Sequence, residues 1–111
     1  MSDCIFCKII NKQIPAKLIF EDADFIAFND IRPKAKVHVL VLPKKHIESL
    51  AHQGSEDLQL LGKLTQLLPV IARQCELEDG FRVVIKTGSG GGQEVPHLHY
   101  HILGGPKLPG L

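Results

Sequence analysis

The segment His97–Leu103 (HLHYHIL) constrains the fold more strongly than any other part of the chain. Histidines and large apolar residues alternate in it, and successive side chains of a β-strand point to opposite faces. A strand here places three imidazoles on one face and Leu98, Tyr100 and Ile102 on the other. The pattern therefore predicts a half-buried strand whose apolar face packs on the core and whose histidine face belongs to a site.

Three interpretations fit this histidine face: scattered surface histidines, an adventitious metal patch, or a catalytic site. We favour catalysis because the alternation is strict and follows directly on a glycine loop. An imidazole has an unperturbed pKa of ~6.5, so both protonation states are accessible for nucleophilic and acid–base chemistry.

The glycine loop is the segment Thr87–Glu94 (TGSGGGQE). Glycine lets backbone N–H groups approach a phosphate closely, but Gly/Ser runs are more often flexible linkers. The position of the loop beside the histidines favours the first interpretation, because a donor-lined loop next to a nucleophile suits phosphoryl transfer.

A Cys-x-x-Cys pair, Cys4 and Cys7, is the third chemical feature. It fits a structural zinc site, a thioredoxin-like redox pair, or two unbound cysteines on one short helix. Zinc needs two further ligands, for which His46 and His97 are the candidates. The redox interpretation lacks the strand that precedes such a motif in a βαβ unit.

The remaining pattern predicts one mainly antiparallel α+β domain over residues 1–111. We expect a short helix over Cys4–Asn11 with Asp3 as its N-cap, and a long helix from Ser55 to about Cys75 that Pro69 kinks or interrupts. The expected strands are two within Lys17–Asn29, then Lys36–Leu42, Phe81–Thr87 and His97–Leu103.

The composition limits the classes of binding partner that we expect for this chain. The formal net charge is +1 and 44% of the residues are hydrophobic, so we expect neither a nucleic-acid partner nor a membrane partner. The first ten residues lack the pattern of a signal peptide, and no apolar run approaches the ~18 residues of a membrane span. We therefore expect a cytoplasmic protein with reduced thiols.

The segment His97–Leu103 matches the His-φ-His-φ-His-φ-φ signature of the histidine triad superfamily, in which φ is an apolar residue. Further segments along nearly the whole chain resemble the Hint branch of purine nucleoside phosphoramidases. These are Ile14–Lys17, Phe20–Asp22, Ala27–Ile31, Leu42–Ile47, Gly91–Gln93 and Leu103–Gly105.

The resemblance implies a HIT-like fold, with a five-stranded antiparallel sheet and one long and one short helix. It implies a homodimer in which the two sheets join into one. It also implies hydrolysis of purine nucleoside phosphoramidates at the α-phosphate through a nucleotidyl-histidine intermediate, without a catalytic metal. The alternatives are a dinucleoside polyphosphate hydrolase, a nucleotide-binding or scaffolding protein with incidental hydrolysis, and a purely structural zinc module.

Carried over by position, the resemblance makes His99 the nucleophile and lets His101 contact the phosphate and assist the proton or the leaving group. The carbonyl of His97 orients His99, and His38 supports the site from a neighbouring strand. Substrate-binding residues are assigned in the same way. Gly92, Gln93 and the backbone of Glu94 hold phosphate oxygens and the leaving group, Asp30 binds the ribose hydroxyls, and Ile31, Phe6, Ile9 and Ile14 surround the base.

Four features modify this assignment. Lys86 replaces an asparagine that usually contacts the nucleotide, Glu94 replaces a common serine, and Pro96 replaces an aromatic residue. In addition, Cys4, Cys7, His46 and His97 match the zinc ligands of metal-bearing members of the superfamily, which implies a structural zinc ion.

Overall fold

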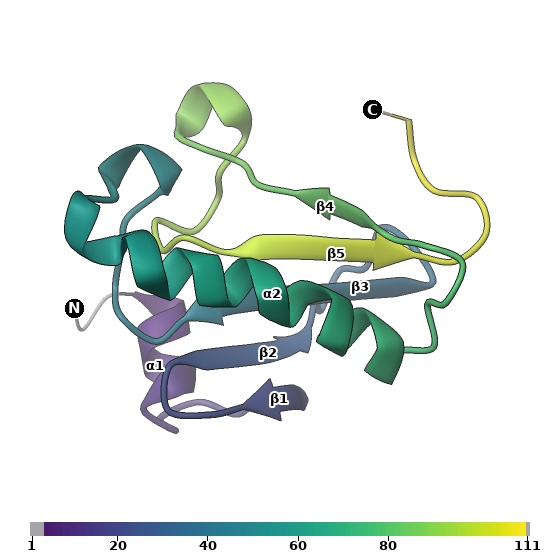
Figure 1. Cartoon of the computed structure of the whole chain (residues 1–111), viewed down its shortest axis with the longest axis horizontal. Coiled ribbons are helices and arrows are strands. Elements are labelled where there is room, and N and C mark those ends of the chain that lie inside the picture. The colour runs from purple at the N-terminus through teal and green to yellow at the C-terminus, as the bar shows by residue number, and fades with distance from the viewer. Residues whose placement is uncertain (1–3, 111) are drawn as a thin grey trace.

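The computed structural model describes residues 4–110, which form a five-stranded antiparallel sheet with a helix on each face (Figure 1). Its strands are β1 (Leu18–Glu21), β2 (Phe25–Asn29), β3 (Val37–Pro43), β4 (Arg82–Val84) and β5 (Tyr100–Gly104). Their order across the sheet is β1-β2-β3-β5-β4, so the last strand lies beside the middle one. The predicted α+β fold class is confirmed.

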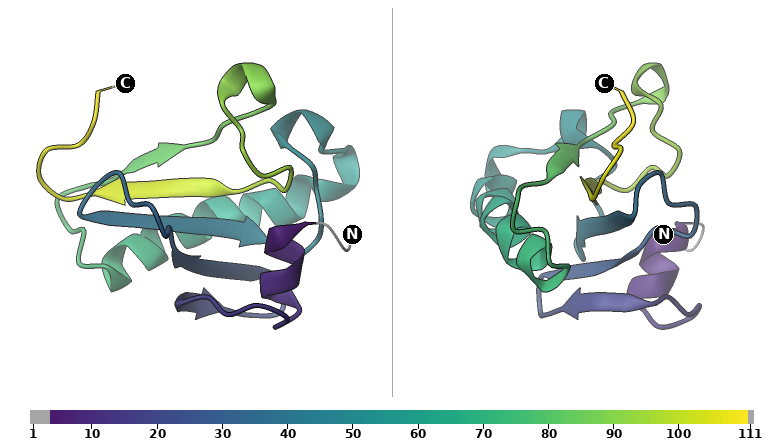
Figure 2. Two further views of the ribbon diagram at one scale, coloured as in Figure 1. Left: turned by 180° about the vertical axis from the view of Figure 1, so that it is seen from behind. Right: turned by 90° about the vertical axis from the view of Figure 1, so that its right-hand side faces the viewer.

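The two helices lie on opposite faces of the sheet (Figure 2). They are the short α1 (Ile5–Ile10) and the long α2 (Leu58–Gln74), and the 3-10 turns are η1 (Leu50–His52), η2 (Ser55–Asp57) and η3 (Ser89–Gly91). Asp3, the expected N-cap of the short helix, lies outside the described residues; the Cys4 thiol caps α1 by accepting a hydrogen bond from the N–H of Cys7 at 3.3 Å. Within residues 4–110, neither helix has the length and hydropathy needed to cross a membrane.

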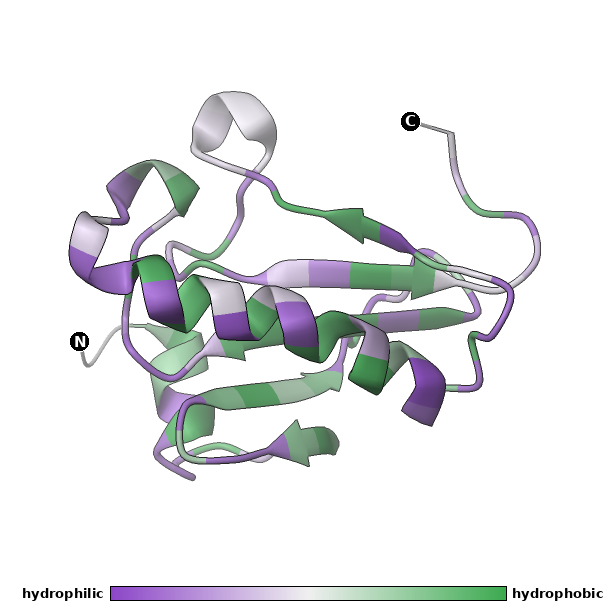
Figure 3. Cartoon of the chain, viewed as in Figure 1, coloured by the Kyte–Doolittle hydropathy of each residue, from purple (hydrophilic) through white to green (hydrophobic). Residues whose placement is uncertain are grey.

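Successive side chains of the central strands point to opposite faces of the sheet, so each face has its own hydrophobic core. Val39 and Val41 of β3 pack toward α2 with Ile102 of β5, whereas Leu40 and Leu42 pack toward α1. Helix α2 alternates between hydrophobic and hydrophilic residues along its length, as expected for a helix with one face on a sheet (Figure 3). Its fully or nearly fully buried residues are Leu61, Leu64, Leu68, Ile71 and Ala72.

The predicted last strand begins three residues too early. Pairing between β3 and β5 ends where Val41 opposes Tyr100, and its extension would place Leu98 opposite Pro43. Proline has no N–H to donate to a ladder, and the N–H of Leu98 donates instead to the carbonyl of Ile47 at 2.6 Å. The predicted strand Phe81–Thr87 is likewise shorter, because the chain leaves the sheet after β4 to form the glycine loop.

Pro69 does not interrupt the long helix, so the interruption, one of the two effects expected of it, is wrong. Helix α2 continues through it from Leu58 to Gln74. Proline removes one helical hydrogen bond and costs roughly 3 kcal/mol in a helix interior. The carbonyl deprived of its donor belongs to the exposed Thr65, where water can replace the bond, and the buried Leu68 and Ile71 hold both flanking turns on the sheet.

Candidate functional site

The three histidines of the predicted histidine face are buried: His97 is 0%, His99 7% and His101 8% exposed. His101 opposes Leu40 in the β3–β5 pairing, so it lies on the face of the sheet that α1 covers. The rings of His99 and His101 are neighbours with centroids 5.0 Å apart. Phe6 of α1 packs edge-on against His99 at a centroid distance of 5.0 Å. This burial excludes the interpretation as scattered surface histidines.

A main-chain carbonyl fixes the orientation of His99. The Nδ1 atom of its ring lies 2.7 Å from the carbonyl oxygen of His97. A carbonyl only accepts hydrogen bonds, so Nδ1 carries the proton and Nε2 carries the free lone pair. Burial lowers the pKa of His99, so the ring is neutral at pH 7 and Nε2 is available as a nucleophile.

A second carbonyl orients His97 in the opposite sense. Its Nε2 donates to the carbonyl of Pro43 at 2.9 Å, which leaves the lone pair on Nδ1. That lone pair faces the Sγ atom of Cys4 at 3.4 Å and the Nδ1 atom of His46 at 3.1 Å. The side chain of His97 therefore belongs to the cysteine cluster, while its carbonyl belongs to His99.

The four predicted zinc ligands converge in space. The candidate donor atoms of Cys4, Cys7, His46 and His97 all lie within 4.8 Å of one another. Cys7 Sγ lies 3.4 Å from His46 Nδ1 and 3.7 Å from His97 Nδ1. Zn–S and Zn–N bonds of ordinary length separate tetrahedral ligands by roughly 3.3–3.8 Å. Two thiolates would also neutralise the charge of Zn²⁺, so this donor set fits the ion in spacing and in chemistry.

Asp30, His38 and His101 also converge within 4.8 Å, but their lone pairs do not suit a metal. The backbone N–H of Lys34 donates to His38 Nδ1 at 3.0 Å, so the neutral ring carries its proton on Nε2. This Nε2 faces Asp30 Oδ2 at 3.4 Å and His101 Nδ1 at 2.9 Å. A protonated nitrogen cannot ligate a cation, and the group is a hydrogen-bonded chain.

Much of the glycine loop is hydrogen-bonded internally. The N–H groups of Gly91 and Gln93 donate to the carbonyl of Gly88, and that of Gly92 donates to the carbonyl of Ser89. Gly88 and Gly92 have φ angles of 70° and 82°, which glycine adopts without strain. Among residues 4–110, no protein acceptor takes the N–H groups of Ser89, Gly90 or Glu94. Of these three free amides, that of Glu94 is nearest to the histidines along the chain, so it is the candidate donor to a ligand.

Gln93 braces the loop. Its side-chain amide donates to the carbonyls of Glu48 at 2.8 Å and Val95 at 2.9 Å, and its Oε1 accepts the N–H of Gly88 at 2.8 Å. The predicted contacts of Gly92 and Gln93 with substrate stay predictions. The bonds described here give Gln93 a structural role, because it ties the loop to the segment after β3.

Lys86 lies close enough to His99 for its charge to affect that ring. Its aliphatic chain runs along the loop, since a Cβ atom at Gly92 would lie 3.8 Å from Lys86 Cδ. Burial is the main cause of the lowered pKa of His99; the ammonium of Lys86 adds to it and the carboxylate of Glu94 opposes it.

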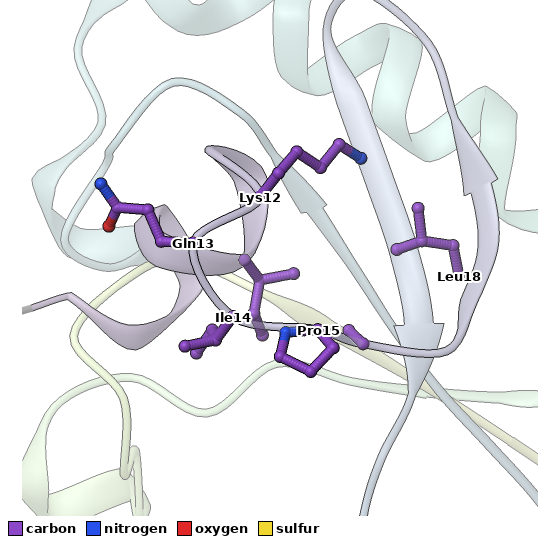
Figure 4. A pocket seen from close by; sticks show the side chains of 7 residues that line it. Lys12, Gln13, Ile14, Pro15 and Leu18 are labelled. Atoms are coloured by element: carbon purple, nitrogen blue, oxygen red, sulfur yellow. The ribbon is translucent and has the colours of Figure 1, made fainter.

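The residues predicted to surround a base are only partly brought together. Phe6 and Ile9 are buried on α1, Ile14 is half-buried, and Ile31 is 91% exposed. Ile9 and Ile14 share a cavity of about 280 Å³ (Figure 4). Its other lining residues are Lys12, Gln13, Pro15, Ala16 and Leu18. Neither Phe6 nor Ile31 lines it. Asp30 Oδ1 accepts the N–H of Arg32 at 2.8 Å, which fixes the carboxylate predicted to bind ribose.

Sequence reasoning missed two groups that orient the histidines, the N–H of Lys34 and the carbonyl of Pro43. Both belong to the main chain, so their residue types carry no signal for these contacts.

Four findings compare the chain with known proteins. A family model described as "Scavenger mRNA decapping enzyme C-term binding" matches residues 3–109. Protein HitA of Neisseria gonorrhoeae is 52% identical over 106 residues, 96% of this chain and 99% of that protein. The 14 kDa zinc-binding protein of Zea mays is 43% identical over 109 residues, 96% of this chain and 85% of that protein. A solved structure of a HIT family hydrolase from Legionella pneumophila Philadelphia 1 has a TM-score of 0.91 and 44% identity, and the match covers 95% of each chain.

The buried histidines predict a loss of stability in acid. Burial lowers the pKa of His101 from 6.5 to about 4. Between these values the unfolded chain binds a proton that the folded chain does not, so the free energy of unfolding falls as the pH drops through this window. The loss is about 3 kcal/mol over the full window. Urea unfolding between pH 7.5 and pH 4 measures it.

His101→Asn is the matched variant for this series, because it removes this linked proton. We expect its stability to depend less steeply on pH than that of the wild type, whereas the exposed His52→Asn should keep the wild-type slope. Equal slopes for wild type and His101→Asn would contradict the assignment.

Proposed function

Because the chain belongs to the histidine triad (HIT) family of nucleotide-binding hydrolases, we propose that it hydrolyses purine nucleoside phosphoramidates at the α-phosphate. The observation that carries the proposal is the orientation of His99, whose neutral ring presents the Nε2 lone pair in a buried site. An imidazole held in this way can attack phosphorus without prior loss of a proton.

The proposed reaction has two displacements. In the first, the lone pair of His99 Nε2 forms a bond to the α-phosphorus, and the P–N bond breaks with its electron pair on the amine, which takes up a proton from solvent. In the second, water attacks the same phosphorus and loses a proton to solvent, and the N–P bond breaks with its electron pair on Nε2. This step releases a nucleoside monophosphate and restores the neutral ring. No metal is required for either displacement.

Three donors around His99 support the proposal. The N–H of Glu94 and the Nε2–H of His101 can hydrogen-bond phosphoryl oxygens, and the ammonium of Lys86 adds a positive charge nearby. Fixed donors of this kind stabilise negative charge as it develops on those oxygens. In the same proposal, Asp30 binds the ribose hydroxyls while Phe6, Ile9, Ile14 and Ile31 surround the purine.

A second substrate class, dinucleoside polyphosphates, is favoured by one observation. Lys86 places a cation beside the nucleophile at a position where this branch usually has an asparagine. A cation there suits a leaving group that carries negative charge, as a nucleotide does and an amine does not.

The central prediction concerns AMP release from adenosine 5′-phosphoramidate. We expect His99→Ala to lower turnover by roughly a thousandfold or more, because it removes the nucleophile. His52→Ala is the matched control, since His52 is exposed and lies outside the site. Chromatographic separation of AMP from substrate measures the rate.

The same assay separates the alternatives. Turnover of diadenosine polyphosphate without turnover of the phosphoramidate would contradict the first substrate class and support the second. Undetectable turnover of both, with nucleotide affinity retained in His99→Ala, would identify a binding protein.

We also propose a structural zinc ion held by Cys4, Cys7, His46 and His97, whose side chains fit it in spacing. The ion would join α1 to the segments after β3 and before β5. Burial is the main cause that raises the pKa of Cys7, and zinc binding would displace its proton. Thiolates of this kind persist in a reducing compartment, which supports a cytoplasmic location.

Cys4→Ser tests the zinc proposal. Serine can still cap α1 but supplies no thiolate, so the bound zinc should fall from about one ion per chain and the melting temperature should fall more than the turnover does. Cys75→Ser is the control because Cys75 lies outside the cluster. Elemental analysis gives the metal content, and an unchanged content in Cys4→Ser would contradict the proposal.

We further propose that two copies pair through β4, so that their sheets join. Strand β4 is an edge of the sheet; Phe81, which directly precedes it, and Val83 within it are 38% and 37% exposed. An unpaired edge with exposed apolar side chains is suited to strand pairing.

A charge on this edge should separate the copies. We expect Val83→Asp to sediment as a monomer at concentrations where wild type is a dimer, since pairing would bury the carboxylate. Leu18→Asp is the matched control on the opposite edge strand, at 41% exposure, and should remain dimeric. A monomeric wild type in sedimentation velocity would refute the dimer.

A further inference from the structure

The loop between β2 and β3 contributes a backbone group to the histidine site. The N–H of Lys34 donates to His38 Nδ1 at 3.0 Å. A peptide N–H can only donate, so Nδ1 of His38 must accept and cannot itself carry a proton. The single proton of a neutral His38 therefore lies on Nε2, on the opposite side of the ring.

This proton determines the state of the next ring. His38 Nε2 lies 2.9 Å from His101 Nδ1, and both side chains are buried. If His101 carried its proton on Nδ1, two N–H donors would face each other at that distance. The arrangement that forms a hydrogen bond is His38 Nε2–H donating to His101 Nδ1, which leaves the proton of His101 on Nε2.

Asp30 does not change this outcome. Its Oδ2 lies 3.4 Å from His38 Nε2, farther than His101 Nδ1, and a carboxylate also only accepts. Both neighbours of His38 Nε2 are therefore acceptors. Desolvation by burial lowers the pKa of His38 and brings that of His101 to about 4, so both rings are neutral at pH 7.

The hydrogen-bonded series from Lys34 through His38 to His101 ends at the Nε2–H of His101, a donor that has no acceptor among the described residues. His101 Nε2 is the buried side-chain nitrogen that finds no hydrogen-bond partner within residues 4–110. An unpaired buried polar group is unfavourable, so a ligand oxygen that accepts from it gains affinity. Its ring is the neighbour of the His99 ring, at 5.0 Å between centroids.

We propose that the backbone amide of Lys34, acting through His38, fixes the tautomer of His101 so that its Nε2–H donates to a phosphoryl oxygen of the substrate. Lys34 and His38 are positioning residues in this scheme, and His101 is the residue that touches the substrate. The inference rests on the proposed function for the identity of the acceptor, but the tautomer itself is a property of the free protein.

The scheme limits what His101 does in the reaction. A neutral imidazole that gives up its only N–H proton becomes an imidazolate, and His38 cannot replace that proton without losing its own. In this scheme, His101 stabilises charge by hydrogen bonding through the Nε2–H of its neutral ring.

The first test reads the tautomer directly in the protein without nucleotide. Two-bond ¹H–¹⁵N correlation spectra distinguish Nδ1–H from Nε2–H histidine, and we expect Nε2–H for both His38 and His101. His38→Ala should abolish the preference in His101. His38→Gln places an amide N–H near the position of Nε2, so it should restore both the preference and part of the turnover.

The second test removes the amide itself. Lys34→Pro lacks the N–H, whereas Lys34→Ala loses the same side chain and keeps the N–H, so their ratio isolates the backbone donor. We expect kcat for adenosine 5′-phosphoramidate to be roughly tenfold or more lower in Lys34→Pro than in Lys34→Ala, with a smaller change in KM. If Lys34→Pro fails to fold, the His38→Gln and His38→Ala pair carries the test.

The outcomes separate this inference from the proposed function. A wild-type spectrum with Nδ1–H on His101 overturns the inference even if the enzyme is active. Equal kcat for folded Lys34→Pro and Lys34→Ala overturns the role of the amide. A wild type that shows the Nε2–H tautomer but hydrolyses no nucleotide supports the tautomer assignment and overturns the proposed function alone.

Discussion

The pairing of β3 with β5 is the interaction on which the rest of the structure depends. It joins the two strands that hold His38 and His101, and its register places these side chains on the same face, two pairs apart. The same pairing ends where Val41 opposes Tyr100, and the Pro43 carbonyl beyond it accepts from His97. A slip of one residue would send His101 of β5 to the face covered by α2.

Main-chain groups determine which ring nitrogen carries the proton in three of the histidines. A carbonyl sets the proton of His99, another sets that of His97, and an amide sets that of His38. Peptide groups do not titrate and do not change rotamer, so they define proton positions more firmly than side-chain partners would. As a result, His99 has a free lone pair on Nε2, His97 directs its lone pair toward the cysteines, and His38 directs an N–H donor toward His101.

The sequence allows much of this arrangement to be predicted, and the limits have physical causes. The strict alternation of histidines and apolar residues in His97–Leu103 identifies the histidine face. The side chains keep this alternation even at His97 and His99, which lie before the first paired residue of β5. The end of that ladder could not be predicted, since it depends on Pro43 lying opposite Leu98. Pro69 misleads because helix packing on the sheet outweighs a local preference. The orienting groups of Lys34 and Pro43 belong to the backbone, which is the same in every residue.

The internally bonded glycine loop has a thermodynamic consequence. A glycine-rich segment loses more conformational entropy on ordering than any other. Here the bonds of Gly91, Gly92 and Gln93, together with the Gln93 brace to Glu48, order the loop during folding. An anion that arrives at the Glu94 amide therefore meets a preorganised surface, and its binding free energy is not diminished by the freezing of a mobile segment.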